Sequence, residues 1–297
     1  MKLSTQTHVF SRRFGDEKAI KLLAEIGYDM LDYSMFASPL KQPDVFGDGY
    51  LEICKKLKKT ADDCGIGFNQ THAPFPSHKA DDEDYNNWVF GAIVRAIEVT
   101  SLIGAKIVVV HPTAAVKENR RKEFNLAFFN RLKPYCETYG VKVALENMFG
   151  SNPNNGQIIP NVCSFTKEFC EYLDELDDRY FTACLDVGHS GLVGETAQNM
   201  IVGLGHDRLR SLHVHDNNFL RDLHTLPFTQ NLDWKAIMLA LREIDYTGEF
   251  TFEADGFLTK MPDELLVPAS RFMCETGRVL ISWFETGNIP AGDSKGE

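Results

Sequence analysis

The chain has 297 residues, of which 43% are hydrophobic and 25% charged, an ordinary composition for one large globular domain or two small ones. Its formal net charge of −11 disfavours adhesion to nucleic acid or to an anionic membrane, so the expected partner is a small molecule. Seven dispersed cysteines without a C-x-x-C pair indicate reduced thiols and a cytoplasmic protein. We expect no signal peptide and no membrane span, while a homo-oligomer remains open.

Short β-like runs alternate with helical patterns along the chain. Eight runs rich in apolar and β-branched residues predict strands at Lys2–Thr7, Met30–Met35, Ile66–Thr71, Lys106–Val110, Val141–Leu145, Phe181–Leu185, Leu209–Val214 and Glu249–Phe252. Eight helical segments, several closed by a glycine, are predicted at Asp16–Gly27, Tyr50–Cys64, Tyr85–Leu102, Glu123–Tyr139, Phe165–Leu176, Glu195–Leu204, Trp234–Ile244 and Leu265–Phe284. A segment rich in Asn, Gly and Pro predicts a loop at Gly150–Pro160.

This alternation is typical of a single-domain (β/α)8 TIM barrel, an α/β fold of about this size. We expect the barrel to span residues 1–285 and residues 286–297, which contain Gly, Pro and Ser, to form a flexible tail. The alternative, an open doubly wound sheet, would need a glycine-rich phosphate loop after the first strand. The sequence has no such loop there.

Side chains of metal-binding types lie at the ends of six predicted strands. They are His72, His111, Glu146, Asp186, His213 and Glu253. Because the active site of a TIM barrel lies at the carboxyl ends of its strands, the fold would bring these groups together. A single carboxylate in such a position is often only the N-cap of the next helix, whereas six such groups in succession favour a shared site.

The stretch Ser211–His224 contains three histidines and two aspartates. His213 and His215 alternate with aliphatic residues, so in a regular strand both imidazoles point to the same face. On its own, such a pair could as well be surface or hydrogen-bonded core histidines as metal ligands. Together with the carboxylates at neighbouring strand ends, the pair predicts a divalent-metal site.

Several motifs resemble those of the xylose isomerase-like TIM barrel superfamily. They are His-Ala-Pro-Phe at 72–75, Val-His-Pro at 110–112, Leu-Glu-Asn at 145–147, Leu-Asp-Val-Gly-His at 185–189, His-Val-His-Asp at 213–216, Asp-x-His at 222–224 and Phe-Glu at 252–253. The superfamily includes ketose 3-epimerases, hydroxypyruvate isomerases, inosose-processing enzymes and endonuclease IV. The resemblance spans nearly the whole chain and is more specific for the superfamily than for one reaction.

The resemblance to the epimerase branch implies a metal centre formed by Glu146, Asp186, His213 and Glu253. Three carboxylates and one imidazole suit Mn²⁺ best, with Zn²⁺, Co²⁺ and Mg²⁺ as alternatives. In that branch the metal polarises the carbonyl of an open-chain ketose, and two carboxylates move a proton through an enediolate. The implied catalytic residues are Glu146 and Glu253, and the implied activity is that of a metal-dependent isomerase or epimerase of a ketose or related polyol.

The resemblance leaves other activities open. Endonuclease IV holds three zinc ions, and its nine ligands can be matched to His72, His111, Glu146, Asp186, His189, His213, Asp222, His224 and Glu253. An enzyme for abasic DNA should carry cationic loops around the barrel mouth, whereas the loop after the third strand runs into the acidic residues 81–84. An inosose dehydratase-like lyase would share the enolising step, and a non-catalytic sugar-binding barrel would keep the same site.

In the epimerase interpretation, six further residues bind the substrate or a second metal. They are His72, His111, His189, His215, Asp222 and His224. Epimerases of free ketoses carry a hydroxyl-binding arginine shortly after the metal histidine. Here Phe219 lies near that position and Arg221 follows two residues later, so the resemblance does not fix the substrate.

Aromatic residues and three other histidines complete the expectations. Phe36, Phe75 and Phe149 are interpreted as core residues that also lie near the mouth, where rings can stack on a sugar. We expect His8, His78 and His206 to lie on the surface without a role in the site.

Overall fold

The computed structural model describes residues 1–41 and 44–289, and within these ranges eight parallel strands form one sheet. They are β1 (Leu3–Gln6), β2 (Met30–Ser34), β3 (Gly67–His72), β4 (Ile107–Val110), β5 (Lys142–Glu146), β8 (Phe181–Asp186), β9 (Leu209–His213) and β10 (Phe250–Phe252). The order β10-β1-β2-β3-β4-β5-β8-β9 follows the chain. Val214 closes the ring, because its N–H donates to the Thr251 carbonyl at 2.9 Å and its carbonyl accepts from Glu253 at 3.1 Å. The predicted TIM barrel is confirmed.

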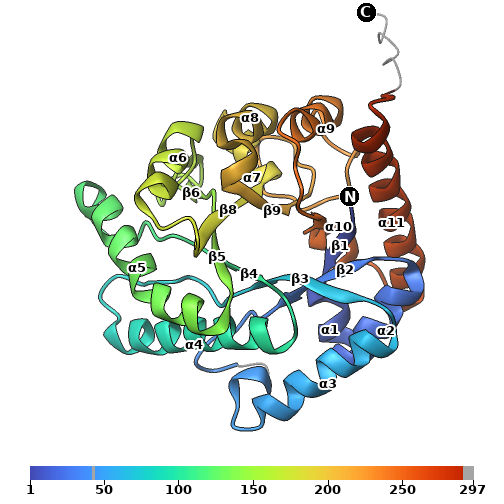
Figure 1. Ribbon diagram of the computed structural model, residues 1–297. Coiled ribbons are helices and arrows are strands. Elements are labelled where there is room, and N and C mark those ends of the chain that lie inside the picture. Colours follow the sequence, from blue (N-terminus) through green and yellow to red (C-terminus); the bar gives the residue numbers. More distant parts are fainter. Residues whose placement is uncertain (42–43, 290–297) are drawn as a thin grey trace, which may run out of the picture.

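Helices surround the strands, as Figure 1 shows. The outer ring consists of α2 (Asp16–Ile26), α3 (Tyr50–Asp63), α4 (Glu83–Leu102), α5 (Arg121–Tyr139), α6 (Thr166–Glu175), α8 (Ala197–Arg208), α9 (Trp234–Glu243) and α11 (Asp263–Thr286). Each corresponds to a predicted helix, with ends that differ by a few residues. Because α11 ends at Thr286, it extends one residue past residue 285, where we expected the barrel to end. The predicted tail lies mostly outside the described residues.

Three short helices that the sequence did not predict follow strands at their carboxyl ends. They are α1 (His8–Phe14) after β1, α7 (Val187–Leu192) after β8 and α10 (Asp255–Leu258) after β10. Gly15 separates α1 from α2 because its φ of 79° and ψ of 157° interrupt the helical path. These short helices therefore add side chains to the end of the barrel where the candidate ligands lie.

The predicted loop 150–160 is partly ordered into a hairpin. Its strands β6 (Phe149–Ser151) and β7 (Ile158–Pro160) pair in antiparallel fashion, and the turn between them uses Gly156 at a φ of 70°. Two 3₁₀ turns occur at Asp44–Phe46 and Glu118–Arg120. In the described part of the chain, no helix is both long and apolar enough to cross a membrane.

The core between strands and helices is apolar, whereas the barrel interior carries hydrogen-bonded polar side chains. Leu23, Phe129 and Ile237 are buried on the inner faces of α2, α5 and α9. Inside the barrel, the Ser211 hydroxyl donates to the Gln70 amide oxygen at 2.7 Å. These polar side chains pair with one another, because buried polar groups need hydrogen-bond partners. The candidate ligands lie beyond them, at the carboxyl ends of the strands.

Candidate metal centre

The six candidate ligands at strand ends meet at one end of the barrel. His72, Glu146, Asp186 and His213 are the last residues of β3, β5, β8 and β9, while His111 and Glu253 directly follow β4 and β10. All except His111 are buried, and His111 is partly buried. Parallel strands end at the same edge, so chain topology alone assembles side chains separated by up to 181 residues.

The central group consists of Glu146, Asp186, His213 and Glu253. Each residue offers one donor atom, and the four donor atoms lie within 4.8 Å of one another. Nδ1 of His213 is 3.2 Å from Oε1 of Glu146 and 3.0 Å from Oε2 of Glu253. The imidazole thus lies between the two glutamates.

A second group forms on the other side of Glu146. Nε2 of His111 is 2.9 Å and Nε2 of His72 is 3.7 Å from Oε2 of this carboxylate, and the two nitrogens are 3.0 Å apart. Since both imidazoles direct the same nitrogen toward one carboxylate oxygen, Glu146 is shared between this pair and the central group.

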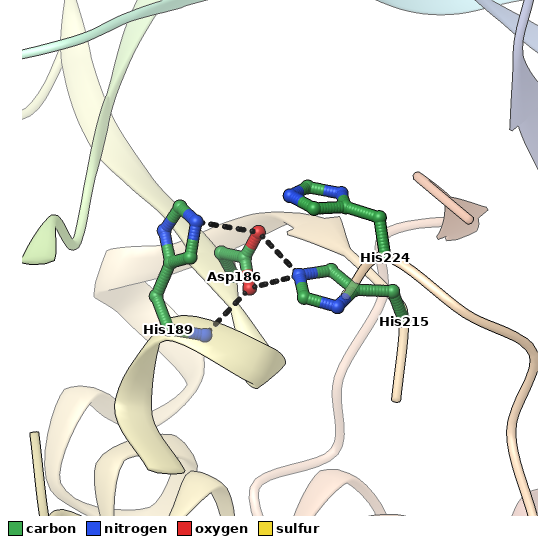
Figure 2. A group of neighbouring side chains, drawn as sticks. All are labelled: Asp186, His189, His215 and His224. Carbon is green, nitrogen blue, oxygen red and sulfur yellow. Dashed lines mark hydrogen bonds and ion pairs between the residues drawn. The ribbon is translucent and has the colours of Figure 1, made fainter. Parts of the chain in front are cut away.

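A third group lies around Asp186 (Figure 2). Nε2 of His215 is 2.9 Å from Oδ1 of Asp186, and Nε2 of His189 is 3.5 Å from Oδ2. Asp186 also caps α7, because Oδ1 accepts from the His189 backbone N–H at 2.8 Å, which places the His189 side chain over the site. Asp222 extends the group by contacting Nε2 of His224 at 2.8 Å.

His213 and His215 both point into the barrel but join different groups. The strand ends at His213, and the ring of His215 stacks on that of His224 with centroids 3.9 Å apart. The ring of His215 also rests against Gly188, where a Cβ atom would overlap the imidazole. The two imidazoles thus point to the same side, as expected, but they contact different carboxylates.

Three residues of the site were not predicted from the sequence. Asp32 on β2 lies with Oδ2 at 3.2 Å from Nε2 of His213, and the Gln6 amide donates to Oε1 of Glu253 at 2.5 Å. Asn147 follows Glu146 and holds the Asp186 backbone through two hydrogen bonds of 2.8 and 2.9 Å. The sequence signal for Asp32 was a carboxylate in the middle of a buried parallel strand, which is normally a continuous apolar run.

His8 corrects another expectation. It was expected on the surface without a role, but as the first residue of α1 it is half-buried at the barrel mouth, with its ring 4.8 Å from that of Phe36. Burial and the adjacent charge of Arg12 lower the pKa of His8 to about 4, so this imidazole is neutral at physiological pH. His206, by contrast, is exposed as expected.

Nearby imidazoles keep the two glutamates ionised. Burial alone would raise the pKa of Glu146, but His213 and His111 hold it well below its usual range. For Glu253, burial is likewise outweighed by His213 and then His224, and its pKa is also low. Both carboxylates are therefore available as bases or as anionic ligands at neutral pH.

The arrangement fits a divalent cation. Oε2 of Glu146 and Oδ1 of Asp222 are shielded from solvent and have no aligned hydrogen-bond donor among the described residues. Although Nε2 of His111 is close to Oε2 of Glu146, the two are not aligned for a hydrogen bond. Buried oxygen and nitrogen lone pairs that face one another need a cation or a proton between them. Carboxylate and imidazole are suitable donors for Mn²⁺, Co²⁺ or Zn²⁺.

Two cavities open beside the candidate ligands, on either side of Phe75. One of about 490 Å³ is lined by His8, Phe36 and Phe75, and one of about 550 Å³ is lined by Phe75 and His111. The Phe75 ring lies 5.4 Å from that of His72. A further cavity of about 610 Å³ lies at the amino-terminal end of the strands and contains none of the candidate ligands. Space for a small molecule therefore adjoins the ligand groups.

Fold and site together define a TIM barrel with a carboxylate and imidazole centre at the carboxyl ends of its strands. The model of the family described as xylose isomerase-like TIM barrel matches residues 20–275. The chain belongs to this family, as the sequence motifs indicated.

Curated relatives match part of the chain, and two of them are described here. An L-ribulose 3-epimerase from Methylomonas sp. (strain DH-1) is 27% identical over 146 residues, which cover 48% of this chain and 45% of that protein. The uncharacterized protein y4fM of Sinorhizobium fredii is 28% identical over 164 residues, which cover 53% and 50%. The chain thus spans about half the length of these relatives.

Solved structures share the whole barrel. D-psicose 3-epimerase from Clostridium cellulolyticum H10, solved with D-tagatose, has a TM-score of 0.75 at 16% identity and covers 95% of this chain and 99% of that one. A D-tagatose 3-epimerase-like protein has a TM-score of 0.71 at 21% identity over 95% and 99%. At these identities the likeness establishes the fold.

Proposed function

We propose that the protein is a divalent-metal-dependent isomerase or epimerase that acts on a ketose or a related sugar. The observation that carries the proposal is the convergence of Glu146, Asp186, His213 and Glu253, whose donor atoms lie within 4.8 Å of one another. The similar proteins support the same chemistry, since their names describe epimerases of L-ribulose, D-psicose and D-tagatose.

The central group would hold the metal ion. Its three carboxylates and one imidazole suit Mn²⁺ best, with Zn²⁺, Co²⁺ and Mg²⁺ as alternatives. When bound, such an ion polarises a carbonyl and makes the neighbouring C–H more acidic.

Glu146 and Glu253 would exchange the proton on the substrate carbon. Their low pKa values keep both carboxylates ionised, and the Gln6 amide fixes Oε1 of Glu253 so that Oε2 faces His213. One carboxylate removes a proton from the carbon next to the carbonyl, which leaves an enediolate. For epimerisation, the other glutamate takes up a proton from solvent and delivers it to the opposite face of that carbon, whereas for isomerisation the first glutamate would return its proton to the neighbouring carbon.

Solvent exchange tests the proposal. The Mn²⁺-loaded protein is incubated in D₂O with a panel of ketoses, and we expect deuterium at the carbon next to the carbonyl together with an epimer or isomer. Loss of water from the sugar would instead identify a lyase. Binding of sugars without exchange or product across the panel would contradict the proposal and favour a sugar-binding barrel.

A second candidate is phosphodiester hydrolysis at a multinuclear zinc site. The observation in its favour is that the second and third groups add histidines on both sides of the central group, His72 and His111 around Glu146, and His189 and His215 around Asp186. Elemental analysis of the purified protein separates the candidates. About one Mn or Co per chain supports the sugar chemistry, whereas close to three Zn, with incision of abasic-site DNA above a chelator-treated control, supports hydrolysis.

A further inference from the structure

The cavity of about 490 Å³ beside the ligand groups lies between α1 and the segment that follows β2. Its apolar wall consists of Phe36 and Phe75, whose ring centroids are 5.1 Å apart. The Phe36 ring also lies 5.0 Å from that of His72. The same aromatic residues therefore border both this cavity and the candidate metal centre, and the volume is within the range of small-molecule sites.

Two cations on the rim of this cavity have no counterion within residues 1–41 and 44–289. Arg12 and Lys41 line it, and the side chains of both are without an ion pair or hydrogen bond among the described residues. The neighbouring Arg13 differs, because its guanidinium donates to the Met261 carbonyl at 2.6 Å and contacts Asp263 at 3.1 Å. Arg13 thus fixes α1 to the rest of the barrel, while Arg12 remains available at the cavity.

The remaining polar groups of the cavity also suit an oxygen-rich ligand. The hydroxyl oxygens of Ser11 and Ser34 are shielded from water and have no hydrogen-bond partner in the described part of the chain. Because both oxygens are shielded, a ligand in the cavity would reach them only after rotation of the serine side chains. The acidic residue in the cavity wall, Asp16, is engaged by the Tyr33 hydroxyl at 2.8 Å, and His8 is neutral. The cavity therefore presents two cations, one carboxylate that is hydrogen-bonded to Tyr33, and neutral polar groups.

We infer that the substrate of the proposed reaction is an anionic sugar, whose phosphomonoester or carboxylate group binds Arg12 and Lys41 while its reacting carbons face the metal centre. This inference rests on the proposed function. A guanidinium forms paired, charge-assisted hydrogen bonds with either group. Although the chain as a whole carries a net charge of −11, the two cations at this cavity create a local field that favours an anion there.

The test compares ligands that differ only in the anionic group. Calorimetry on the Mn²⁺-loaded protein measures binding of the D-ketohexoses, their 6-phosphates and the corresponding ketouronates. We expect at least one anionic form to bind about tenfold or more tightly than its neutral sugar, and the preferred form distinguishes phosphate from carboxylate. Arg12→Gln and Lys41→Gln should each reduce that preference about tenfold and leave affinity for the neutral sugar unchanged.

Matched controls remove the same charges elsewhere. Arg271→Gln on the exposed face of α11 and Lys56→Gln on that of α3 should keep the preference for the anionic form. Equal affinities for neutral and anionic sugars, or a preference that survives Arg12→Gln and Lys41→Gln, would overturn the inference. Epimerisation of neutral sugars with no anionic preference would refute this inference and leave the proposed function standing. Arg12-dependent anion binding without proton exchange would refute the proposed function and leave only an anion-binding cavity.

Discussion

Asp32 and His213 lie on strands that are not neighbours, yet Oδ2 of the carboxylate is 3.2 Å from Nε2 of the imidazole. The Gln70 amide donates to the same oxygen at 3.0 Å, which fixes the carboxylate in place. A proton on Nε2 of His213 would bond to Asp32 and leave the Nδ1 lone pair facing Glu146 and Glu253. With a metal ion on Nδ1, the carboxylate inside the barrel would thus set the orientation and tautomer of His213.

Asp32→Asn is expected to weaken Mn²⁺ binding about 10- to 100-fold, because an amide supports the imidazole less well than a carboxylate does. Calorimetric titration of both proteins measures the difference. Asp207→Asn is the matched control, since this exposed carboxylate on α8 lies just before β9 begins, at the opposite end of the barrel. If Asp32→Asn bound Mn²⁺ with wild-type affinity, the contact would have no role in orienting His213.

His213→Ala should lower the metal content of the purified protein, because it removes the imidazole donor of the central group. Elemental analysis measures this content, and circular dichroism checks that the barrel has folded. His206→Ala removes an exposed histidine at the far end of the barrel and should keep the wild-type content. Full occupancy in His213→Ala would exclude this residue as a ligand.

Glu253→Gln should reduce proton exchange at the substrate carbon by about 10²- to 10⁴-fold, because the amide cannot accept the proton. The measurement is deuterium incorporation at saturating Mn²⁺, with metal occupancy determined on the same sample. Glu243→Gln changes an exposed glutamate at the end of α9 and should leave exchange intact. Unaltered exchange in Glu253→Gln would refute its role as a base.

Metal binding should also stabilise the fold. A ligand present at 100 times its Kd adds about 2.7 kcal/mol to the free energy of unfolding, which for a chain of 297 residues corresponds to a rise in Tm of roughly 4 °C. Differential scanning calorimetry of chelator-treated protein with and without Mn²⁺ measures the shift. A Tm that does not respond to Mn²⁺, Co²⁺ or Zn²⁺ would argue against a metal centre in the native protein.

The cysteines should react slowly in the native protein. All seven are free thiols, and burial raises the pKa of Cys136 and of Cys184 to about 12, so almost no thiolate is present at pH 7.5. We expect a thiol reagent to modify Cys64 and Cys170, which are partly exposed, well before the buried cysteines, and to modify all seven after denaturation. Rapid labelling of Cys184 would indicate that the barrel opens readily.

The sequence was sufficient for the barrel and for the strand-end residues of the site. Regular alternation of apolar runs and helical segments defines the topology, and parallel strands necessarily end at one edge. A residue such as Glu146 or Asp186 could therefore be placed without any knowledge of side-chain packing. The short helices α1 and α7 could not be predicted as easily, because segments of six or seven residues depend on tertiary contacts more than on their own propensity.

The partners behind the ligands were harder to predict. Asp32 lies within a strand and reaches His213 only because the barrel closes, a contact over 181 residues that no local pattern encodes. Gln6 is a similar case, since its contact with Glu253 joins the first strand to the last. The cavity lined by Arg12 and Lys41 was not predicted, because it depends on how α1 packs over the barrel mouth. The sequence pattern did not define that helix.

The backbone at Gly188 has a consequence for comparing members of this family. Any side chain there would collide with the imidazole of His215, so α7 and the segment after β9 can meet only through this glycine. A homologue with a bulkier residue at the equivalent position must have moved or replaced its histidine. The residue at this position therefore indicates, from sequence alone, whether a family member preserves the histidine of the third group around Asp186.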